Sequence, residues 1–241
     1  MKAIGLTHYL PVSDENCLQD MALPMPHPSR RDLLVKVDAI SVNPVDTKVR
    51  APKDAVETEA KVLGWDACGT VISAGEGVSL FSAGQKVFYA GDITRAGCNS
   101  EYHVIDERLV GHAPEKLSIE QAAAIPLTAL TAWEALFNRM AINLDGDLTN
   151  DTVQKSILII GGAGGVGSMA CQLASRLAGL TVIATASRPE SITWCKTMGA
   201  DYIVNHHNLM DDMAALAIKH VDYILCCNDT DMHFDSMAEL I

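Results

Sequence analysis

The first half of the chain is patterned as short strands separated by turn residues. The segment Leu33–Val42 begins with consecutive apolar residues and then alternates, which is typical of a partly buried strand. Thr70–Ala74 and Gln85–Ala90 are two further strand candidates, and a glycine-containing turn follows each of them. Several short strands at this spacing predict an antiparallel barrel or sandwich up to about residue 115.

The second half has a longer period. Ser118 and Gln121 fit a capping box ahead of a short helix, because each side chain can pair with a backbone N–H that lacks a helical partner. Pro126 interrupts this helix, and apolar residues at helical spacing from Ala129 to Met140 predict a second helix after it. Four apolar runs then alternate with helical stretches, at Ser156–Ile160, Leu180–Thr185, Tyr202–Val204 and Val221–Cys226. Strands separated by helices predict parallel βαβ units, so we expect two domains, residues 1–117 and 118–241.

A glycine-rich loop follows the first of these apolar runs and carries the pattern G-x-G-x-x-G. Glycine is needed in such a loop because a side chain at the tight turn would block a pyrophosphate. The helix that follows offers N–H groups and the positive end of its dipole to that anion. We therefore predict a dinucleotide site made by Gly162, Ala163, Gly164, Gly165, Val166 and Gly167. The alternative is a glycine-rich turn with no ligand.

The end of the second apolar run indicates which dinucleotide fits. An NAD site commonly has Asp or Glu there, which holds the ribose 2′-hydroxyl. This chain has Ser187 and Arg188 instead, and a guanidinium suits a 2′-phosphate dianion. We predict NADP(H) as the cofactor. In the alternative interpretation Arg188 is a solvated residue at the start of a helix, or Glu190 turns back toward a 2′-hydroxyl.

Composition narrows the class of protein. With 49% hydrophobic and 20% charged residues, the 241-residue chain can bury a core and is not expected to be disordered. A net charge of −12 without any basic stripe argues against a nucleic-acid partner. No apolar stretch reaches the ~18 residues of a membrane helix, and the start lacks the apolar core of a signal peptide. Seven irregularly spaced cysteines favour a reducing compartment, so we expect a cytoplasmic protein without a membrane.

Four motifs occur in the order seen in medium-chain dehydrogenases/reductases. They are Asn43–Asp46, Gly64–Thr70, Ala122–Trp133 and the glycine loop. The set resembles the quinone oxidoreductase and zinc-type alcohol dehydrogenase-like branch, and Gly91–Arg95 and Glu101–His103 add to this likeness. The resemblance covers nearly the whole chain. It implies an α/β protein in which an N-terminal GroES-like β-barrel domain precedes a Rossmann domain, a doubly wound parallel sheet.

Only four of the six strands of a Rossmann sheet are found in the sequence, so we expect an incomplete second domain, with the C-terminal part missing. The resemblance further implies a homodimer or homotetramer for the full-length form.

The resemblance raises the question of zinc. Zinc-dependent members use a Cys, a His and an acid where this chain has Asn43, Trp65 and Asp66, and neither an amide nor an indole is a serviceable ligand. The His206–His207 and Cys226–Cys227 pairs would point to opposite faces of a strand, so we interpret them as core or surface residues. We predict neither a catalytic nor a structural zinc.

Without a Lewis acid, removing hydride from a simple alcohol is difficult. Hydride transfer to a quinone or an enone needs less activation, because the negative charge that arrives with the hydride delocalises onto oxygen. We therefore expect an NADPH-dependent enzyme that reduces a quinone or an α,β-unsaturated carbonyl by hydride transfer, with a small-molecule carbonyl or quinone as substrate. The alternatives are a zinc-dependent alcohol dehydrogenase and a non-catalytic NADPH-binding protein.

The resemblance also implies roles for individual residues. Asn43, Asp46, Lys48 and Thr128 are the candidate catalytic residues: Asn43 and Thr128 would face the nicotinamide, and the Lys48 ammonium would hydrogen-bond an acceptor oxygen. In the alternative interpretation Asn43 and Asp46 only cap the turn at Pro44, and Lys48 is solvated.

For the cofactor, the resemblance implies that the glycine loop cradles the pyrophosphate and that Ser187 and Arg188 approach the 2′-phosphate with help from His206. Asn228 would lie near the nicotinamide ribose.

Overall fold

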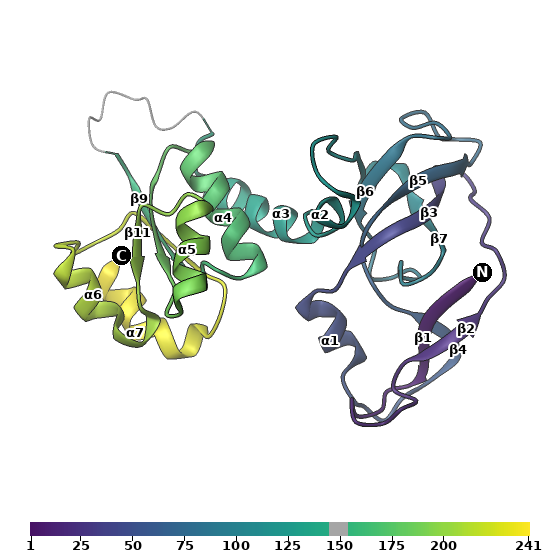
Figure 1. The fold of residues 1–241 in the computed structure, drawn as a ribbon, viewed down its shortest axis with the longest axis horizontal. Helices are drawn as coiled ribbons and strands as arrows, with labels where there is room; N and C mark the ends of the chain where they lie inside the picture. The colour runs from purple at the N-terminus through teal and green to yellow at the C-terminus, as the bar shows by residue number, and fades with distance from the viewer. Residues whose placement is uncertain (145–153) are drawn as a thin grey trace. The chain divides into compact units, whose positions relative to one another are not determined.

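The computed structural model describes residues 1–144 and 154–241. Two compact units make up the chain, Met1–Leu127 and Thr128–Ile241 (Figure 1). The domain boundary expected from the sequence, near residue 118, precedes helix α2 (Ile119–Ala123), and the structure places this helix in the first unit.

The first unit is built mainly from antiparallel strands. Its elements are, in chain order, β1 (Lys2–His8), β2 (Gln19–Ala22), β3 (Asp32–Ser41), α1 (Pro44–Arg50), β4 (Val56–Val62), β5 (Asp66–Ala74), β6 (Lys86–Ala90), β7 (Tyr102–Asp106), the 3-10 turn η1 (Glu107–Leu109), β8 (Val110–His112) and α2. Three strands pair in the order β2-β1-β4, and five pair in the order β7-β3-β5-β6-β8. The strands predicted at Leu33–Val42, Thr70–Ala74 and Gln85–Ala90 are confirmed as β3, β5 and β6.

The five-stranded sheet buries side chains on both of its faces. Ala67 and Tyr89 belong to the core on one face, and their neighbours Cys68 and Phe88 pack on the other face against the alanines of α2. This alternation is the period of two that a strand requires. The capping box predicted for α2 is confirmed, because Ser118 N–H donates to Gln121 Oε1 (3.0 Å) and Gln121 N–H donates to Ser118 Oγ (3.2 Å).

The second unit is a parallel sheet with helices on both sides. Its elements are α3 (Pro126–Trp133), whose first two residues belong to the first unit, the π-helical turn η2 (Glu134–Arg139), β9 (Ser156–Ile160), α4 (Gly165–Arg176), β10 (Thr181–Thr185), α5 (Pro189–Thr197), β11 (Tyr202–Val204), the 3-10 turn η3 (His206–Asn208), α6 (Leu209–Ala215), β12 (Tyr223–Cys226) and α7 (Thr230–Leu240). The strands pair in the order β11-β10-β9-β12, all parallel. Each of the four predicted apolar runs forms one of these strands.

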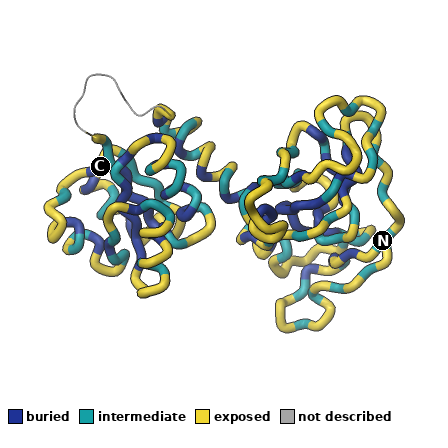
Figure 2. The backbone as a smooth tube through the Cα atoms, turned by 45° about the horizontal axis from the view of Figure 1, so that its top comes forward, coloured by how far each residue is buried: buried dark blue, intermediate teal, exposed yellow. Residues whose placement is uncertain are grey.

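Strand β9 separates two cores. Ile157 and Ile159 pack with residues of α3, α4 and α5, whereas Leu158 and Ile160 pack with residues of α6 and α7. All four side chains are buried, as the dark centre of this unit shows (Figure 2). A strand covered on both faces explains the unbroken apolar run in the sequence, because neither face meets water.

Two further expectations concern the described residues as a whole. Within residues 1–144 and 154–241, no helix combines the length and the apolarity that a bilayer crossing requires. All seven cysteines lie in these residues and are free thiols.

Candidate functional site

The glycine loop is tethered to the neighbouring strand where β9 ends. Gly161 turns the chain with a φ of 82°, a conformation that costs glycine little. Its N–H donates to Oγ1 of the buried Thr185, the last residue of β10, at 2.9 Å. Gly164 N–H then donates to the Gly161 carbonyl at 3.0 Å, and α4 begins at the next residue. The loop is therefore fixed against the carboxyl ends of two strands.

The three glycines of the motif are required for different reasons. A Cβ on Gly162 would lie 2.7 Å from the Ala184 Cβ, and a Cβ on Gly167 would lie 2.2 Å from the Gly161 carbonyl oxygen. Gly162 therefore allows the loop to pack closely on β10, and Gly167 allows α4 to pack closely on the loop. At Gly164 a Cβ would meet only the Gly161 oxygen, at 3.3 Å, so the space in front of this residue is open. This division matches the roles that a dinucleotide-binding loop assigns to its glycines.

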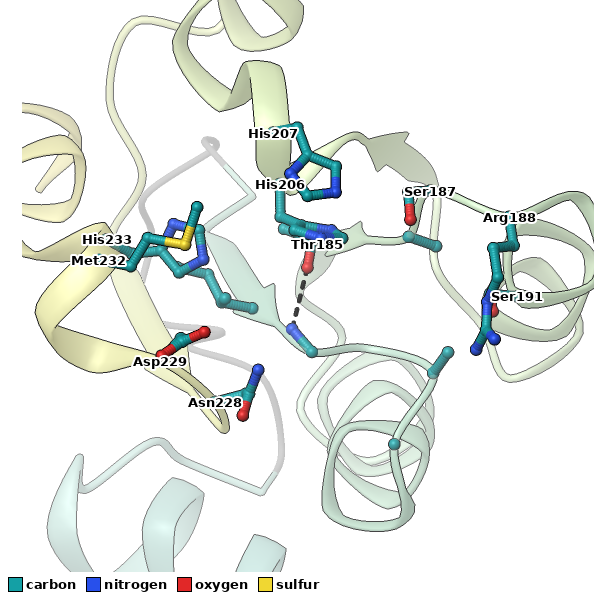
Figure 3. A pocket seen from close by; sticks show the side chains of 15 residues that line it. Thr185, Ser187, Arg188, Ser191, His206, His207, Asn228, Asp229, Met232 and His233 are labelled. Atoms are coloured by element: carbon teal, nitrogen blue, oxygen red, sulfur yellow. Dashed lines mark hydrogen bonds between the residues drawn. The ribbon is translucent and has the colours of Figure 1, made fainter.

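A pocket of about 240 Å³ lies over this loop (Figure 3). We call it the glycine-loop pocket, and its lining residues are Ile160, Gly161, Ala163, Gly164, Thr185, Ala186, Ser187, Arg188, Ser191, His206, His207, Asn228, Asp229, Met232 and His233. Six of the ten cofactor residues predicted from the sequence are among them, namely Ala163, Gly164, Ser187, Arg188, His206 and Asn228. The other four, Gly162, Gly165, Val166 and Gly167, form the loop turn and the first turn of α4 and do not line the pocket.

Arg188 stands where β10 passes into α5. It is the N-cap residue of that helix, and both it and Ser187 are exposed. Glu190 lines a separate depression with Trp194 and does not line the glycine-loop pocket. The indole N–H of Trp194 donates to Ser168 Oγ at 2.7 Å, which joins α5 to α4 beneath the loop. Of the charged residues Arg188 and Glu190 that follow β10, it is therefore the cationic Arg188 that borders the glycine-loop pocket.

Two adjacent histidines both line this pocket. We expected His206 and His207 to point to opposite faces of a strand, and this expectation is wrong because β11 ends at Val204 and the pair lies in the 3-10 turn η3. Their ring centroids are 4.0 Å apart. Burial lowers the pKa of His206, and the nearby His207 and His233 lower it further. The ring of His233, from α7, lies 6.4 Å from that of His206 and is itself buried.

Sequence reasoning did not select several residues that line the pocket. Thr185, Ser191, His207, Asp229, Met232 and His233 are of this kind. Most of them follow β10, β11 or β12, and the carboxyl ends of parallel strands meet at one edge of a sheet, where ligands bind in such folds. The strand assignment therefore already contained a signal for them.

A second polar cluster lies in the first unit, where α1 begins. The Asn43 side-chain N–H donates to Asp66 Oδ2 at 2.8 Å, and the Asn43 backbone N–H donates to Asp46 Oδ2 at 2.7 Å. The other Asp66 oxygen accepts the N–H of Leu127 at 2.8 Å. Asn43, Asp46 and Asp66 are all buried. Burial raises the pKa of Asp66 to about 6 despite these two donors, and the Asp46 carboxylate contributes to the rise.

The remaining two catalytic candidates are Lys48 and Thr128. Lys48 is exposed on α1. Thr128 is buried in the second unit, where its methyl group would lie 2.8 Å from a Cβ on Gly165. Thr128 therefore explains why Gly165 is a glycine: the methyl group fills the space that a side chain there would need.

The donor set of the first unit does not suit zinc. A zinc site takes three or four ligands from Cys, His and carboxylate groups. Both Asp66 oxygens already accept hydrogen bonds, and the Cys98 thiol donates to the Asp66 carbonyl oxygen at 3.4 Å. In residues 1–144 and 154–241, no three His, Cys, Asp or Glu side chains are grouped so that they could hold a metal ion. The described residues therefore do not fit this metal.

Two family models match the chain. The alcohol dehydrogenase GroES-like domain matches residues 29–125, and the zinc-binding dehydrogenase model matches residues 165–241. Among curated proteins, the chain is 46% identical to a zinc-type alcohol dehydrogenase-like protein of Staphylococcus epidermidis, covering 100% of this chain and 70% of that protein. It is 32% identical to a 2-methylene-furan-3-one reductase of Solanum lycopersicum, covering 86% of this chain and 52% of that protein.

Solved structures show the same fold. A Rhizobium etli protein assigned to the zinc-dependent alcohol dehydrogenases superposes with a TM-score of 0.91 at 46% identity, covering 100% of this chain and 69% of that one. The Escherichia coli quinone oxidoreductase in complex with NADPH superposes with a TM-score of 0.78 at 26% identity, covering 100% of this chain and 70% of that one. These matches confirm the predicted fold class, a GroES-like domain followed by a Rossmann-type parallel sheet.

Proposed function

The chain belongs to the medium-chain dehydrogenase/reductase family of oxidoreductases, and from this premise we propose that it transfers hydride from NADPH to a quinone or an α,β-unsaturated carbonyl without zinc. The observation that supports this most directly is the glycine-loop pocket. It brings an open glycine backbone, the start of a 12-residue helix and an exposed guanidinium to one edge of a parallel sheet.

The residues of this pocket fit a nicotinamide dinucleotide. Gly164 lines the pocket without a side chain, so the backbone there can approach a diphosphate. The first-turn amides of α4 have no acceptor within the helix and lie at the positive end of its dipole. In this proposal they bind the pyrophosphate, and Asn228, after β12, lies beside the nicotinamide ribose. The bound cofactor supplies the hydride.

We assign NADPH rather than NADH because of the residues that follow β10. Those that line the pocket there are Ala186, Ser187, Arg188 and Ser191, and none is a carboxylate that could hold a ribose 2′-hydroxyl. Ser187 and Arg188 can instead donate hydrogen bonds to a 2′-phosphate. The carboxylate that does line the pocket, Asp229, follows β12. The NADPH complex of the Escherichia coli quinone oxidoreductase supports this choice.

The choice of acceptor follows from the donor set around Asn43. Position 43 carries an amide, and both oxygens of Asp66 already accept hydrogen bonds. The described residues therefore offer no set of ligands for a metal ion that would polarise an alcohol. A quinone or enone needs only hydrogen-bond donors for the oxygen that gains charge. The reductase named for an enone and the quinone oxidoreductase among the similar proteins support this substrate class.

In this proposal the residues of the first unit position the acceptor. The exposed Lys48 ammonium donates a hydrogen bond to the acceptor oxygen, and Asp66 holds Asn43 in a fixed orientation through its 2.8 Å hydrogen bond. Asp46 fixes the Asn43 backbone from the other side. Thr128 packs beside Gly165 and positions the start of α4.

An assay of NADPH oxidation tests the proposal. Purified protein is mixed with NADPH and either 1,4-benzoquinone or an enone, and metal content is measured on the same preparation. Turnover with either acceptor at well under one equivalent of zinc, unchanged by a chelator, supports the proposal. Chelator-sensitive oxidation of alcohols would show a zinc-dependent alcohol dehydrogenase instead. NADPH binding without turnover on any acceptor would show a non-catalytic NADPH-binding protein.

A further inference from the structure

Three imidazole rings converge on one side of the glycine-loop pocket. His206 and His207 come from η3, and His233 comes from the second turn of α7, so two separate segments supply them. The ring centroids of His206 and His207 are 4.0 Å apart, and those of His206 and His233 are 6.4 Å apart. His233 is only 5% exposed, yet it borders the pocket (Figure 3). In the part of the chain that the structure describes, none of the three rings has a hydrogen-bond or ion-pair partner.

Few charged groups face these rings. Arg188 enters the same pocket from the start of α5, and Asp229 borders it from the N-cap of α7. Asp211, on α6, lines an adjoining depression together with the three histidines. The other charged residues of α5, α6 and α7 line neither space: Glu190, Lys196, Asp212, Asp231, Asp235 and Glu239. Of these, Asp212 is occupied, because its Oδ2 accepts the N–H of Asn205 at 2.7 Å.

Such a cluster responds to an anion. Burial lowers the pKa of His206, and the neighbouring rings of His207 and His233 lower it further, so the His206 ring tends to stay neutral when the pocket holds no anion. A phosphate dianion placed among the rings reverses this preference, because it stabilises imidazolium and accepts its N–H groups. Binding of the anion is then linked to uptake of a proton in the range where histidine titrates.

We propose that His206, His207 and His233 form a proton-linked specificity element for the 2′-phosphate, so that the preference for NADPH over NADH increases as pH falls through the histidine range. This inference rests on the proposed function, because it needs the dinucleotide in this pocket. Arg188 supplies the part of the selection that does not depend on pH, since a guanidinium stays charged. The histidines supply the part that does, and His207 and His233 join His206 in a role that the sequence motifs do not indicate.

Nucleotide fragments test the inference, since 2′,5′-ADP, 3′,5′-ADP and 5′-AMP differ only in the presence or place of one phosphate. Their affinities are measured by calorimetry between pH 8 and pH 6.5, in two buffers of different ionisation enthalpy, so that proton uptake is read directly. We expect the wild-type preference for 2′,5′-ADP over 5′-AMP to rise by about tenfold over this range, the gain of one charged hydrogen bond. Proton uptake should accompany 2′,5′-ADP alone.

Variants separate the histidines from the rest of the pocket. His206→Gln, and the double variant that also carries His207→Gln, should lose both the pH dependence of the preference for 2′,5′-ADP over 5′-AMP and the proton uptake. Arg188→Gln should weaken the binding of 2′,5′-ADP at every pH but leave the pH dependence of this preference unchanged. His220→Gln removes an exposed histidine elsewhere in the same unit and should behave as wild type. The titration of the ligand's own phosphate is common to all variants and cancels in the comparison.

Three results would overturn the inference: the wild-type slope persisting in both His206 variants, an equal slope for 3′,5′-ADP, or 2′,5′-ADP binding without proton uptake. Because His233 is buried, binding by His233→Gln is interpreted only together with its thermal unfolding curve. The variants of the half-buried His206 therefore decide the test. NADPH and NADH are titrated in the same calorimeter as a reference. If the wild-type protein binds neither of them, the proposed function itself fails; if it binds them but shows any of the three results above, the histidine element alone fails.

Discussion

The side-chain amide of Asn43 lies 2.8 Å from Asp66 Oδ2 and donates a hydrogen bond to it, with both residues buried. Through its other oxygen, Asp66 also accepts the N–H of Leu127. One carboxyl group at the start of β5 thus joins the N-cap of α1 to the first turn of α3. Its ionisation state therefore bears on the packing of three elements.

Asp66→Asn should change how stability depends on pH. Because the pKa of Asp66 in the folded protein, about 6, lies above the 3.8 of an ordinary Asp, its stabilising contribution is full below about pH 4 and is lost as pH rises through 6. Relative to the Asn variant, the wild type should lose at most about 3 kcal/mol between pH 4 and pH 7. Urea unfolding of both proteins at each pH measures this.

The Asp46→Asn variant serves as the matched control, because it removes the neighbouring charge and should lower the pKa of Asp66. Parallel stability curves for wild type and Asp66→Asn would contradict the expectation.

The buried His103 should have the opposite effect. Its Nε2 lies 2.9 Å from the Ala96 carbonyl oxygen, which can only accept, so Nε2 carries the hydrogen and Nδ1 accepts from the Tyr89 hydroxyl at 3.0 Å. Burial lowers the pKa of His103 to about 4. The unfolded chain takes up the proton first, so stability falls as pH drops from about 6.5 to 4, by about 3 kcal/mol.

His103→Gln should remove this acid sensitivity while it lowers stability at pH 7, since Tyr89 loses its acceptor. Unfolding curves at pH 7 and pH 4 for both proteins test this. The idea is wrong if the variant and the wild type lose equal stability on acidification.

Two glycines of the same loop should respond differently to alanine. Gly167→Ala places a methyl 2.2 Å from the Gly161 oxygen and should destabilise the second unit by several kcal/mol. Gly164→Ala meets only that oxygen, at 3.3 Å, and should fold with little loss of stability while it weakens NADPH binding. Thermal unfolding and NADPH titration of the two variants make the comparison; wild-type affinity in Gly164→Ala would argue against a ligand at the loop.

Arg188→Glu should weaken NADPH binding by about 100-fold and change NADH binding far less, because it replaces a charged donor with a repelling carboxylate. Arg176→Glu, on the exposed end of α4, changes the net charge equally and should leave the ratio of the two affinities unchanged. Equal losses for NADPH and NADH in Arg188→Glu would remove the basis for choosing NADP(H).

The strands and the α2 cap were predictable because their signals are local. The run Ser156–Ile160 and the capping pair Ser118 and Gln121 each depend on neighbours within a few residues, and the structure confirms them. The glycine loop was predictable for the same reason, since its strand, turn and helix are contiguous.

The histidine cluster was not predictable in this way. His233 meets His206 only because α7 follows β12 at the same sheet edge, and no periodicity links residues this far apart. The error over His206 and His207 arose from treating the pair as part of a strand, although the apolar run and β11 both end at Val204 and the pair lies in the 3-10 turn that follows. Likewise, the raised pKa of Asp66 depends on burial by residues far apart in the sequence, and the motif around Asp66 does not predict that burial.

Alternate side chains of strand β9 pack into two different cores, and this limits which insertions and deletions the protein tolerates. Inserting or deleting one codon within Ser156–Ile160 would exchange the contents of both faces at once and also displace Gly161 from the Thr185 hydroxyl. Length variation in the second unit should therefore concentrate in its connecting segments, and a mutational library of indels should show β9 as the least tolerant stretch of the whole sheet.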